Sequence, residues 1–173
     1  MISAWAAALD RFCDRLNRLT EIAIGLLIAA TVAVTFLQVL FRYGLDSSLS
    51  WSEEFSRYAF IWAIFLGSGS AARRGLHMAV DLLRDALARG YRRLLEAFIA
   101  LVGIVFFAVF GYAAYLLTDN AIGQISTALQ IPIALIYVSA PIGAALTIVH
   151  LVNGVIQARY QPALPSGPDA AAL

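Results

Sequence analysis

The sequence predicts an all-α membrane protein with four transmembrane helices, because it combines a very apolar composition with long runs of residues that carry almost no charge. Of 173 residues, 61% are hydrophobic and 13% are charged, and the mean hydropathy is +0.80. These values lie far from those of soluble globular domains. The net charge of +1 argues against a basic nucleic-acid-binding protein, so we expect the lipid bilayer and no nucleic acid as a partner.

The first span is expected over residues 22–41. This stretch holds no charged residue, and 20 residues at about 1.5 Å each cover the roughly 30 Å of hydrocarbon in a bilayer. The segment before it carries five charges in its middle, which argues against a cleavable signal peptide. Its apolar residues recur at helical spacing and predict an amphipathic helix on the membrane surface: Leu9, Phe12, Cys13, Leu16 and Leu19.

The second span is unusual because its uncharged part is short. Residues 58–72 reach only about 22 Å. A full crossing over residues 52–72 has to include Glu53, Glu54 and Arg57. We therefore expect these three charges to lie in the headgroup region or to pack against protein.

The third and fourth spans are expected over residues 94–117 and 131–156. Glu96 is the one charged residue of the third. In the fourth, Pro132 falls in the first turn, where proline is tolerated, and Pro141 lies inside and predicts a kink. Between the second and third spans, apolar residues at helical spacing predict a second surface helix: Leu76, Val80, Leu83 and Leu87. Residues 1–160 then form one membrane domain, and the proline-containing residues 161–173 are expected to be disordered.

The orientation follows from the arginines, which supply all twelve positive charges. Three arginines precede the first span and six lie in residues 73–93, whereas residues 118–130 contain none. Positive residues favour the cytoplasmic side, so both termini are expected there.

The spans carry few polar groups near their midpoints. Thr31, Thr35, Gln38 and Arg42 form a polar stripe on the first helix, which we interpret as adhesive between helices and less favourably as a solute path. Small residues recur on the second helix (Ala63, Gly67, Ala71) and on the third (Ala100, Gly103, Gly111, Ala114), a spacing that lets helices approach closely.

A charged cluster is expected where the first two spans meet. Glu53 and Arg57 have the favourable i, i+4 order, and Arg42 lies across a short connection from Glu54. The spacing predicts ion pairs, which serve either as a clasp between two helices or as a docking site for a partner.

The sequence holds no recognisable enzyme motif: no phosphate-binding glycine loop, HExxH or nucleophile elbow. One cysteine, Cys13, excludes an internal disulfide. His77 and His150 leave open a haem- or quinone-binding anchor of a respiratory complex, although the predicted position of His77 makes coaxial ligation strained. A small multidrug exporter would need a carboxylate in the first span, and residues 22–41 contain none. We expect no cofactor, no metal site and no catalysis.

A series of short segments then points to one family. They are residues 38–43, 51–54 and 57–58, then Trp62, Gly67, residues 73–75, His77 and residues 80–81, and finally residues 126–132, Tyr137 and residues 141–143. In this order and spacing they resemble the small membrane subunit, of Q or DctQ type, of tripartite ATP-independent periplasmic (TRAP) transporters. The resemblance covers about residues 20 to 155.

The resemblance implies a four-helix scaffold in the bacterial inner membrane, bound to a large membrane subunit. In that family a periplasmic solute-binding protein delivers an organic acid, such as a C4-dicarboxylate or a sialic acid, and the large subunit moves it inward with sodium. The outer part of the scaffold, near the docked binding protein, would include Arg42, Trp51, Glu53, Glu54 and Arg57, and the cytoplasmic corner His77 and Asp81. The other expected interface or structural residues are Gln38, Trp62, Gly67 and Pro141.

Overall fold

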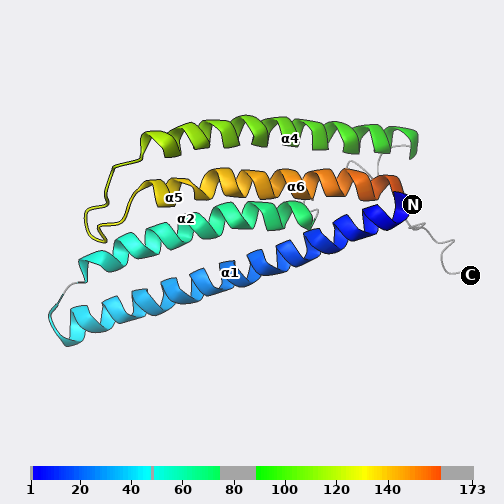
Figure 1. Cartoon of the computed structure of the whole chain (residues 1–173). Helices are drawn as coiled ribbons and strands as arrows, with labels where there is room; N and C mark the ends of the chain where they lie inside the picture. The colour runs from blue at the N-terminus through cyan, green and yellow to red at the C-terminus, as the bar shows by residue number, and fades with distance from the viewer. Residues whose placement is uncertain (1, 48, 75–88, 161–173) are drawn as a thin grey trace, which may run out of the picture.

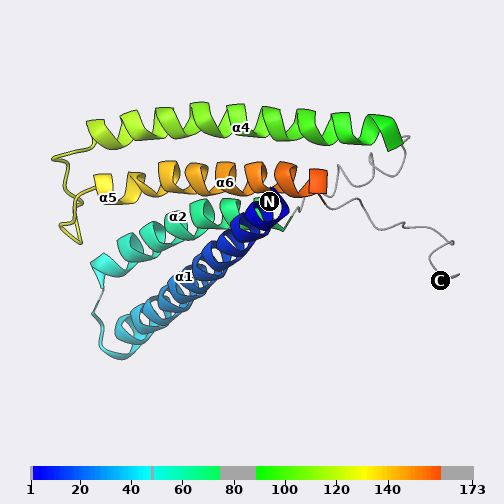
Figure 2. The same ribbon diagram turned by 45° about the vertical axis from the view of Figure 1, so that its right-hand side comes forward.

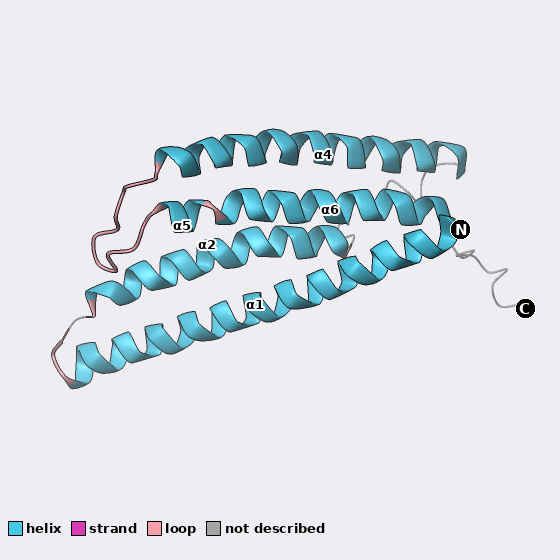
Figure 3. Cartoon of the chain, viewed as in Figure 1, coloured by secondary structure: helices cyan, strands magenta, loops and turns pink. Residues whose placement is uncertain are grey.

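The computed structural model describes residues 2–47, 49–74 and 89–160. Four long helices lie side by side (Figure 1): α1 (Ile2–Gly44), α2 (Ser50–Arg73), α4 (Arg89–Asn120) and α6 (Ser139–Tyr160), with the single-turn α5 (Ala134–Tyr137) just before α6. Figure 3 shows helices and connecting loops in this part of the chain. The all-helical class expected from the sequence is confirmed.

α6 is the central helix of the bundle. It packs against α2, α4 and α1, and α1 also packs along α2. Figures 1 and 2 show the resulting order α4, α6, α2, α1 across the molecule, with α1 inclined to α4 and α6. Helices at the edge of this arrangement leave a large apolar face uncovered, as we find for α1 and α4.

Within the described part of the chain, three helical segments are long and apolar enough to cross a membrane: Ala4–Gly44, Ala97–Asn120 and Ala134–Gln157. α2 has 24 residues but does not meet this criterion. Its first two turns carry the charged residues Glu53, Glu54 and Arg57, which lower the mean hydropathy of the helix. Four helices are therefore observed, and the crossing by α2 stays a prediction.

The segment before residue 22 is helical, as expected, but it is not a separate element, and its location on the membrane surface stays a prediction. Residues 2–21 form the first turns of α1, which continues unbroken for 43 residues. Neither proline nor glycine occurs before Gly25, so nothing in this segment interrupts the backbone hydrogen bonds. One side of the segment is buried in the protein, where Ala6 is 3% and Cys13 0% exposed.

The predicted irregularity of the last span is confirmed, and its start is corrected. The helix is interrupted at Val138, between α5 and α6, three residues before Pro141. Proline has no N–H to donate to the Tyr137 carbonyl, which explains the interruption. The span does not begin at residue 131: Pro132 lies outside the helix and forms an isolated bridge with Ile125.

Close packing of α2 on α6 depends on glycines, but not on the expected Gly67. A Cβ added at Gly143 would come within 2.5 Å of the Phe65 carbonyl oxygen, and one at Gly69 within 2.9 Å of the Leu146 Cβ. At Gly67 it would meet nothing within 4 Å. The prediction for α4 is confirmed, because a Cβ added at Gly103 would lie 3.1 Å from the Leu151 Cδ1 atom of α6, and one at Gly111 would lie 3.1 Å from the Ala144 Cβ.

Three further expectations lie outside the described residues: the surface helix built on Leu76–Leu87, the residues His77 and Asp81, and the disorder of residues 161–173.

Candidate functional site

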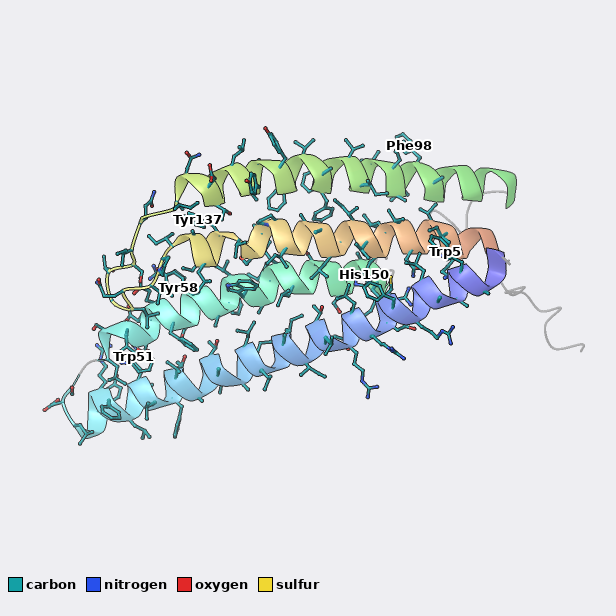
Figure 4. All side chains as sticks on the ribbon, in the orientation of Figure 1. Trp5, Trp51, Tyr58, Phe98, Tyr137 and His150 are labelled. Atoms are coloured by element: carbon teal, nitrogen blue, oxygen red, sulfur yellow. The ribbon has the colours of Figure 1, made fainter. Side chains whose placement is uncertain are left out.

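Two polar sites lie at opposite ends of the bundle. We call them the loop end, which contains the α1–α2 connection and residues 121–133, and the N-terminal end, which contains the start of α1 and the last turns of α6 (Figure 1). Figure 4 shows Trp51 and Tyr58 at the loop end of α2, and His150 on α6 toward the N-terminal end.

Glu54 is the centre of the loop-end site. Its side chain is buried at 8% exposure, and each carboxylate oxygen has donors. Oε2 accepts from the backbone N–H groups of Ala128 at 2.9 Å and Leu129 at 2.8 Å, and Oε1 accepts from the Tyr58 hydroxyl at 2.5 Å. Hydrogen bonds to a carboxylate are stronger than neutral ones, so Glu54 attaches the loop firmly to α2.

The loop that Glu54 holds is a small hairpin. The Ser126 N–H donates to the Ile131 carbonyl at 2.9 Å, and the Ile133 N–H to the Gln124 carbonyl at 2.9 Å. Gln130 closes the turn with a φ of +55°, a left-handed value uncommon outside glycine. Apolar side chains stand out from this loop, with Ile122 70% and Ile125 59% exposed. The site therefore presents an ordered, partly apolar surface.

The predicted ion pairs at the loop end are wrong. Among the described residues, Arg42, Glu53, Glu54 and Arg57 form no salt bridge with one another. Glu53 and Glu54 are consecutive helical residues and point in different directions. Glu54 turns toward the hairpin, whereas Arg42, Glu53 and Arg57 are exposed.

The remaining predicted residues have modest intramolecular roles. Gln38 donates to Glu53 across α1 and α2 at 3.4 Å, and Trp51 packs edge-on against Phe55 with ring centroids 6.5 Å apart. The two threonines of the predicted polar stripe, Thr31 and Thr35, do not bond to α2, because their hydroxyls donate to carbonyls of α1 itself. Trp62 and Pro141 are half-buried. Their partner-binding roles stay predictions.

The N-terminal end holds an ion-pair network that sequence reasoning missed. Arg73 of α2 donates to Asp10 at 2.6 Å and to Asp14 at 2.5 Å, both on α1. Asn153 of α6 donates to the same Asp10 oxygen at 3.0 Å. The network therefore joins three helices in one layer.

A second part of this network lies about two turns further along α1, beyond Asp14. Arg74 pairs with Glu21 at 2.8 Å, and Glu21 also accepts from Asn17 and from Ser70 of α2. Near the Arg73 part of the network, His150 is 2% and Asn153 0% exposed, and the His150 Nδ1 and Asn153 Oδ1 atoms have no described hydrogen-bond partner. Buried polar atoms of this kind commonly bind an ordered water.

A signal for this network was present in the sequence. On a helical projection Asp10, Asp14 and Glu21 share one face, while Arg11, Arg15 and Arg18 occupy another. An acidic face on the first helix and the arginine pair that ends the second are complementary.

The comparison with known families decides the identity. Residues 31–159 match the family described as tripartite ATP-independent periplasmic transporters, DctQ component. The chain belongs to the DctQ family of TRAP transporter small permeases. It is a component of a transporter and not an enzyme.

The relatives of this DctQ chain are named for different solutes. It is 37% identical over 128 residues to the ectoine TRAP transporter small permease protein TeaB of Halomonas elongata, covering 73% of this chain and 65% of the relative. It is 26% identical over 109 residues to the C4-dicarboxylate small permease protein DctQ of Vibrio cholerae, covering 63% and 45%. The chain thus spans less than two thirds of the length of either relative.

A third relative is much longer than this DctQ chain. The sialic acid TRAP transporter permease protein SiaT of Haemophilus influenzae is 30% identical over 95 residues, which are 55% of this chain but only 15% of the relative. A segment similar to a DctQ component therefore also occurs as a small part of a larger permease polypeptide.

Proposed function

We propose that this chain is the scaffold subunit of a TRAP transporter in the bacterial inner membrane, and that it braces a large membrane subunit. That subunit performs sodium-coupled uptake of an organic acid delivered by a periplasmic binding protein. α2 is the fourth span in this proposal, and both termini are cytoplasmic.

The observation that carries this proposal is that buried and half-buried polar side chains bond to other elements of the same chain. Glu54 holds the hairpin, Arg73 joins α1 to α2, and Asn153 joins α6 to Asp10. Ser68 of α2 and Thr147 of α6 share a hydrogen bond of 3.2 Å. Each contact stabilises one arrangement of the helices, which is the task of a rigid support.

The exposed apolar surface supports a partner within the membrane. The most apolar windows of α1 and α4 contribute almost nothing to the buried interior of the chain, apart from alanines of α4 such as Ala114 at 8% exposure. The longer sialic acid relative supports the same interpretation, since there a similar segment shares one polypeptide with a much larger part. The differing solutes in the relatives' names support a solute choice made by other components.

Affinity purification in mild detergent tests the proposal. The tagged chain, produced together with the genes for the other transporter components, is expected to retain a much larger polytopic protein. Recovery of the chain alone, stable and monodisperse, would count against the scaffold function.

Variants of the loop end connect that site with the function. We expect Glu54→Ala and Arg57→Ala to reduce either the recovery of the large subunit or sodium-driven uptake. If both variants left assembly and uptake unchanged, the loop-end residues would serve only the fold of this chain.

A further inference from the structure

The first five turns of α1 have a face that the described protein does not cover. Trp5, Phe12 and Leu19 follow one another at intervals of seven residues and are 66%, 59% and 66% exposed. Two helical turns separate them, so they lie almost in a line along the helix. The opposite side of the same turns, with Ala6, Asp10 and Cys13, is the side that packs on α2 and α6.

Arginines flank this apolar line. Arg11, Arg15 and Arg18 are exposed, and a helical projection places them together on one side of the line. None of the three forms an ion pair with another described residue. The acidic residues of the segment project elsewhere, since Asp10 and Asp14 bond to Arg73 and Glu21 to Arg74. The free surface of the segment is therefore apolar and cationic.

The length of α1 places this surface at the membrane boundary. Its 43 residues extend about 65 Å, whereas the hydrocarbon layer is roughly 30 Å thick and the whole bilayer about 40–45 Å. When the predicted span, residues 22–41, lies in the hydrocarbon, residues 5–19 extend toward the headgroups on the N-terminal side. Figures 1 and 2 show α1 inclined to α4 and α6, and such an inclination lengthens the part of the helix that stays near the headgroup layer.

The apolar line also continues into the membrane span without a break. Ile22 and Leu26 follow Leu19 and are 53% and 66% exposed. A lipid-facing surface at residues 22–41 thus passes directly into the line formed by Trp5, Phe12 and Leu19.

We propose that residues 4–19 of α1 form a binding site for anionic phospholipid headgroups in the leaflet at the N-terminal end. Trp5 and Phe12 enter the interfacial zone, where tryptophan is favoured, and Arg11, Arg15 and Arg18 contact lipid phosphates. Continuity with the membrane-facing surface and the absence of a carboxylate among the described residues on this face favour lipid over a second protein.

Tryptophan fluorescence tests the site on the full chain. The chain has three tryptophans, and the variant Trp51→Phe/Trp62→Phe keeps only Trp5. This variant is reconstituted in phosphatidylcholine vesicles with and without about 30% phosphatidylglycerol. With phosphatidylglycerol present we expect lipids brominated near the headgroup to quench at least about half of the emission. In the same vesicles Arg11→Gln/Arg15→Gln/Arg18→Gln should raise quenching by aqueous acrylamide about twofold or more.

The matched control is Arg42→Gln/Arg57→Gln, which removes exposed arginines from the loop end and should leave Trp5 quenching unchanged. A nitroxide attached at Phe12→Cys in a Cys13→Ala chain gives an independent depth by electron paramagnetic resonance, and we expect it in the headgroup zone.

Two results would overturn the proposal. The first is that acrylamide quenches the Trp5 fluorescence in vesicles as strongly as it quenches free tryptophan, and that phosphatidylglycerol does not change this quenching. The other is protection of Trp5 only when a large membrane subunit is co-reconstituted, which would assign this face to a protein partner. The vesicle measurement needs no other subunit, so it fails or succeeds independently of co-purification.

Discussion

Glu54 shows how one side chain can organise a loop. It follows Glu53 directly in α2, yet Glu53 is exposed and Glu54 is buried with three donors on its carboxylate. The two backbone N–H groups belong to residues 74 and 75 positions further along the chain. Without Glu54 these amides would lack that acceptor, and the tip of the hairpin would lose its attachment to α2.

We predict that Glu54→Gln lowers the thermal midpoint of the purified chain by about 4–8 °C. The amide group cannot accept all three hydrogen bonds, because its nitrogen is a donor. Differential scanning fluorimetry in detergent measures the change. The matched control Glu53→Gln should shift the midpoint by less than about 2 °C, since Glu53 has only a 3.4 Å contact with Gln38. Equal midpoints for the two variants would contradict the assigned role.

Arg73 has a comparable role at the other end of the bundle. Its guanidinium spans two carboxylates of α1, and the side chain of Asp10 is shared with Asn153 of α6. Arginine suits this position, since a planar guanidinium can serve two acceptors at once. Glu54 at one end of the bundle and Arg73 at the other thus each bond to other elements of the chain.

At the scale of elements, the α2–α6 contact sets the spacing of the bundle. Gly143 lies against the backbone of Phe65, and Gly69 lies against Leu146. Such close approach is typical of helix pairs within membranes, where packing and small residues replace the hydrophobic effect as the source of association. The interruption at Val138 lies just before this contact, since α6 begins at Ser139 and Gly143 follows four residues later.

We predict that alanine has different effects at Gly143 and at Gly67, which are both helical glycines. Gly143→Ala places a Cβ within 2.5 Å of a backbone oxygen that cannot move away cheaply, and it should destabilise the chain by about 1–3 kcal/mol. Gly67→Ala meets no atom within 4 Å and should be neutral or stabilising by up to about 1 kcal/mol. Unfolding in mixed micelles with increasing denaturing detergent measures both. A Gly143→Ala chain as stable as the Gly67→Ala chain would refute this account of the contact.

At the scale of the whole molecule, the topology depends on whether α2 crosses the membrane. Arg15 lies in the first turns of α1, and the rest of α1 together with α2 and α4 separates it from Ile122 in the chain. With three crossings these residues are on opposite sides, and with two they are on the same side. The charged first turns of α2 leave only residues 58–72 without charge, which is shorter than the roughly 20 residues that a helix needs to cross the hydrocarbon.

We predict that Ile122→Cys reacts with a membrane-impermeant maleimide on intact cells, whereas Arg15→Cys reacts only after permeabilisation. Both positions are exposed, and the native Cys13 is 0% exposed, so it should give little background. The arginine distribution fixes the expected direction. The reverse pattern would show an inverted protein, and labelling of both cysteines from outside would show that α2 does not cross.

Much of the fold could be predicted from the sequence because long apolar runs have few alternatives in a membrane. The expected second and third spans, 52–72 and 94–117, fall within α2 (Ser50–Arg73) and α4 (Arg89–Asn120). The helix interruption near Pro141 followed from the missing N–H. The family was visible in short segments of fixed order, and the family match confirms it.

Pairing between elements could not be predicted in the same way. The expected ion pairs joined residues that are near in sequence, Glu53 with Arg57 and Arg42 with Glu54. The observed pairs join Arg73 to Asp10 and Asp14, about 60 positions away. A sequence states which residues share a helical face, but it does not state which helix that face will meet.

The sequence by itself determined the helical class, the approximate positions of the long helices, the interruption of the last helix and the family, since each depends on local periodicity, backbone chemistry or short motifs. Only the tertiary structure decided that the N-terminal segment continues into the first span, that Glu54 holds a distant hairpin, and that Arg73 links three helices with Asn153. These features depend on the register and rotation of packed helices, which arise from contacts summed over the whole bundle.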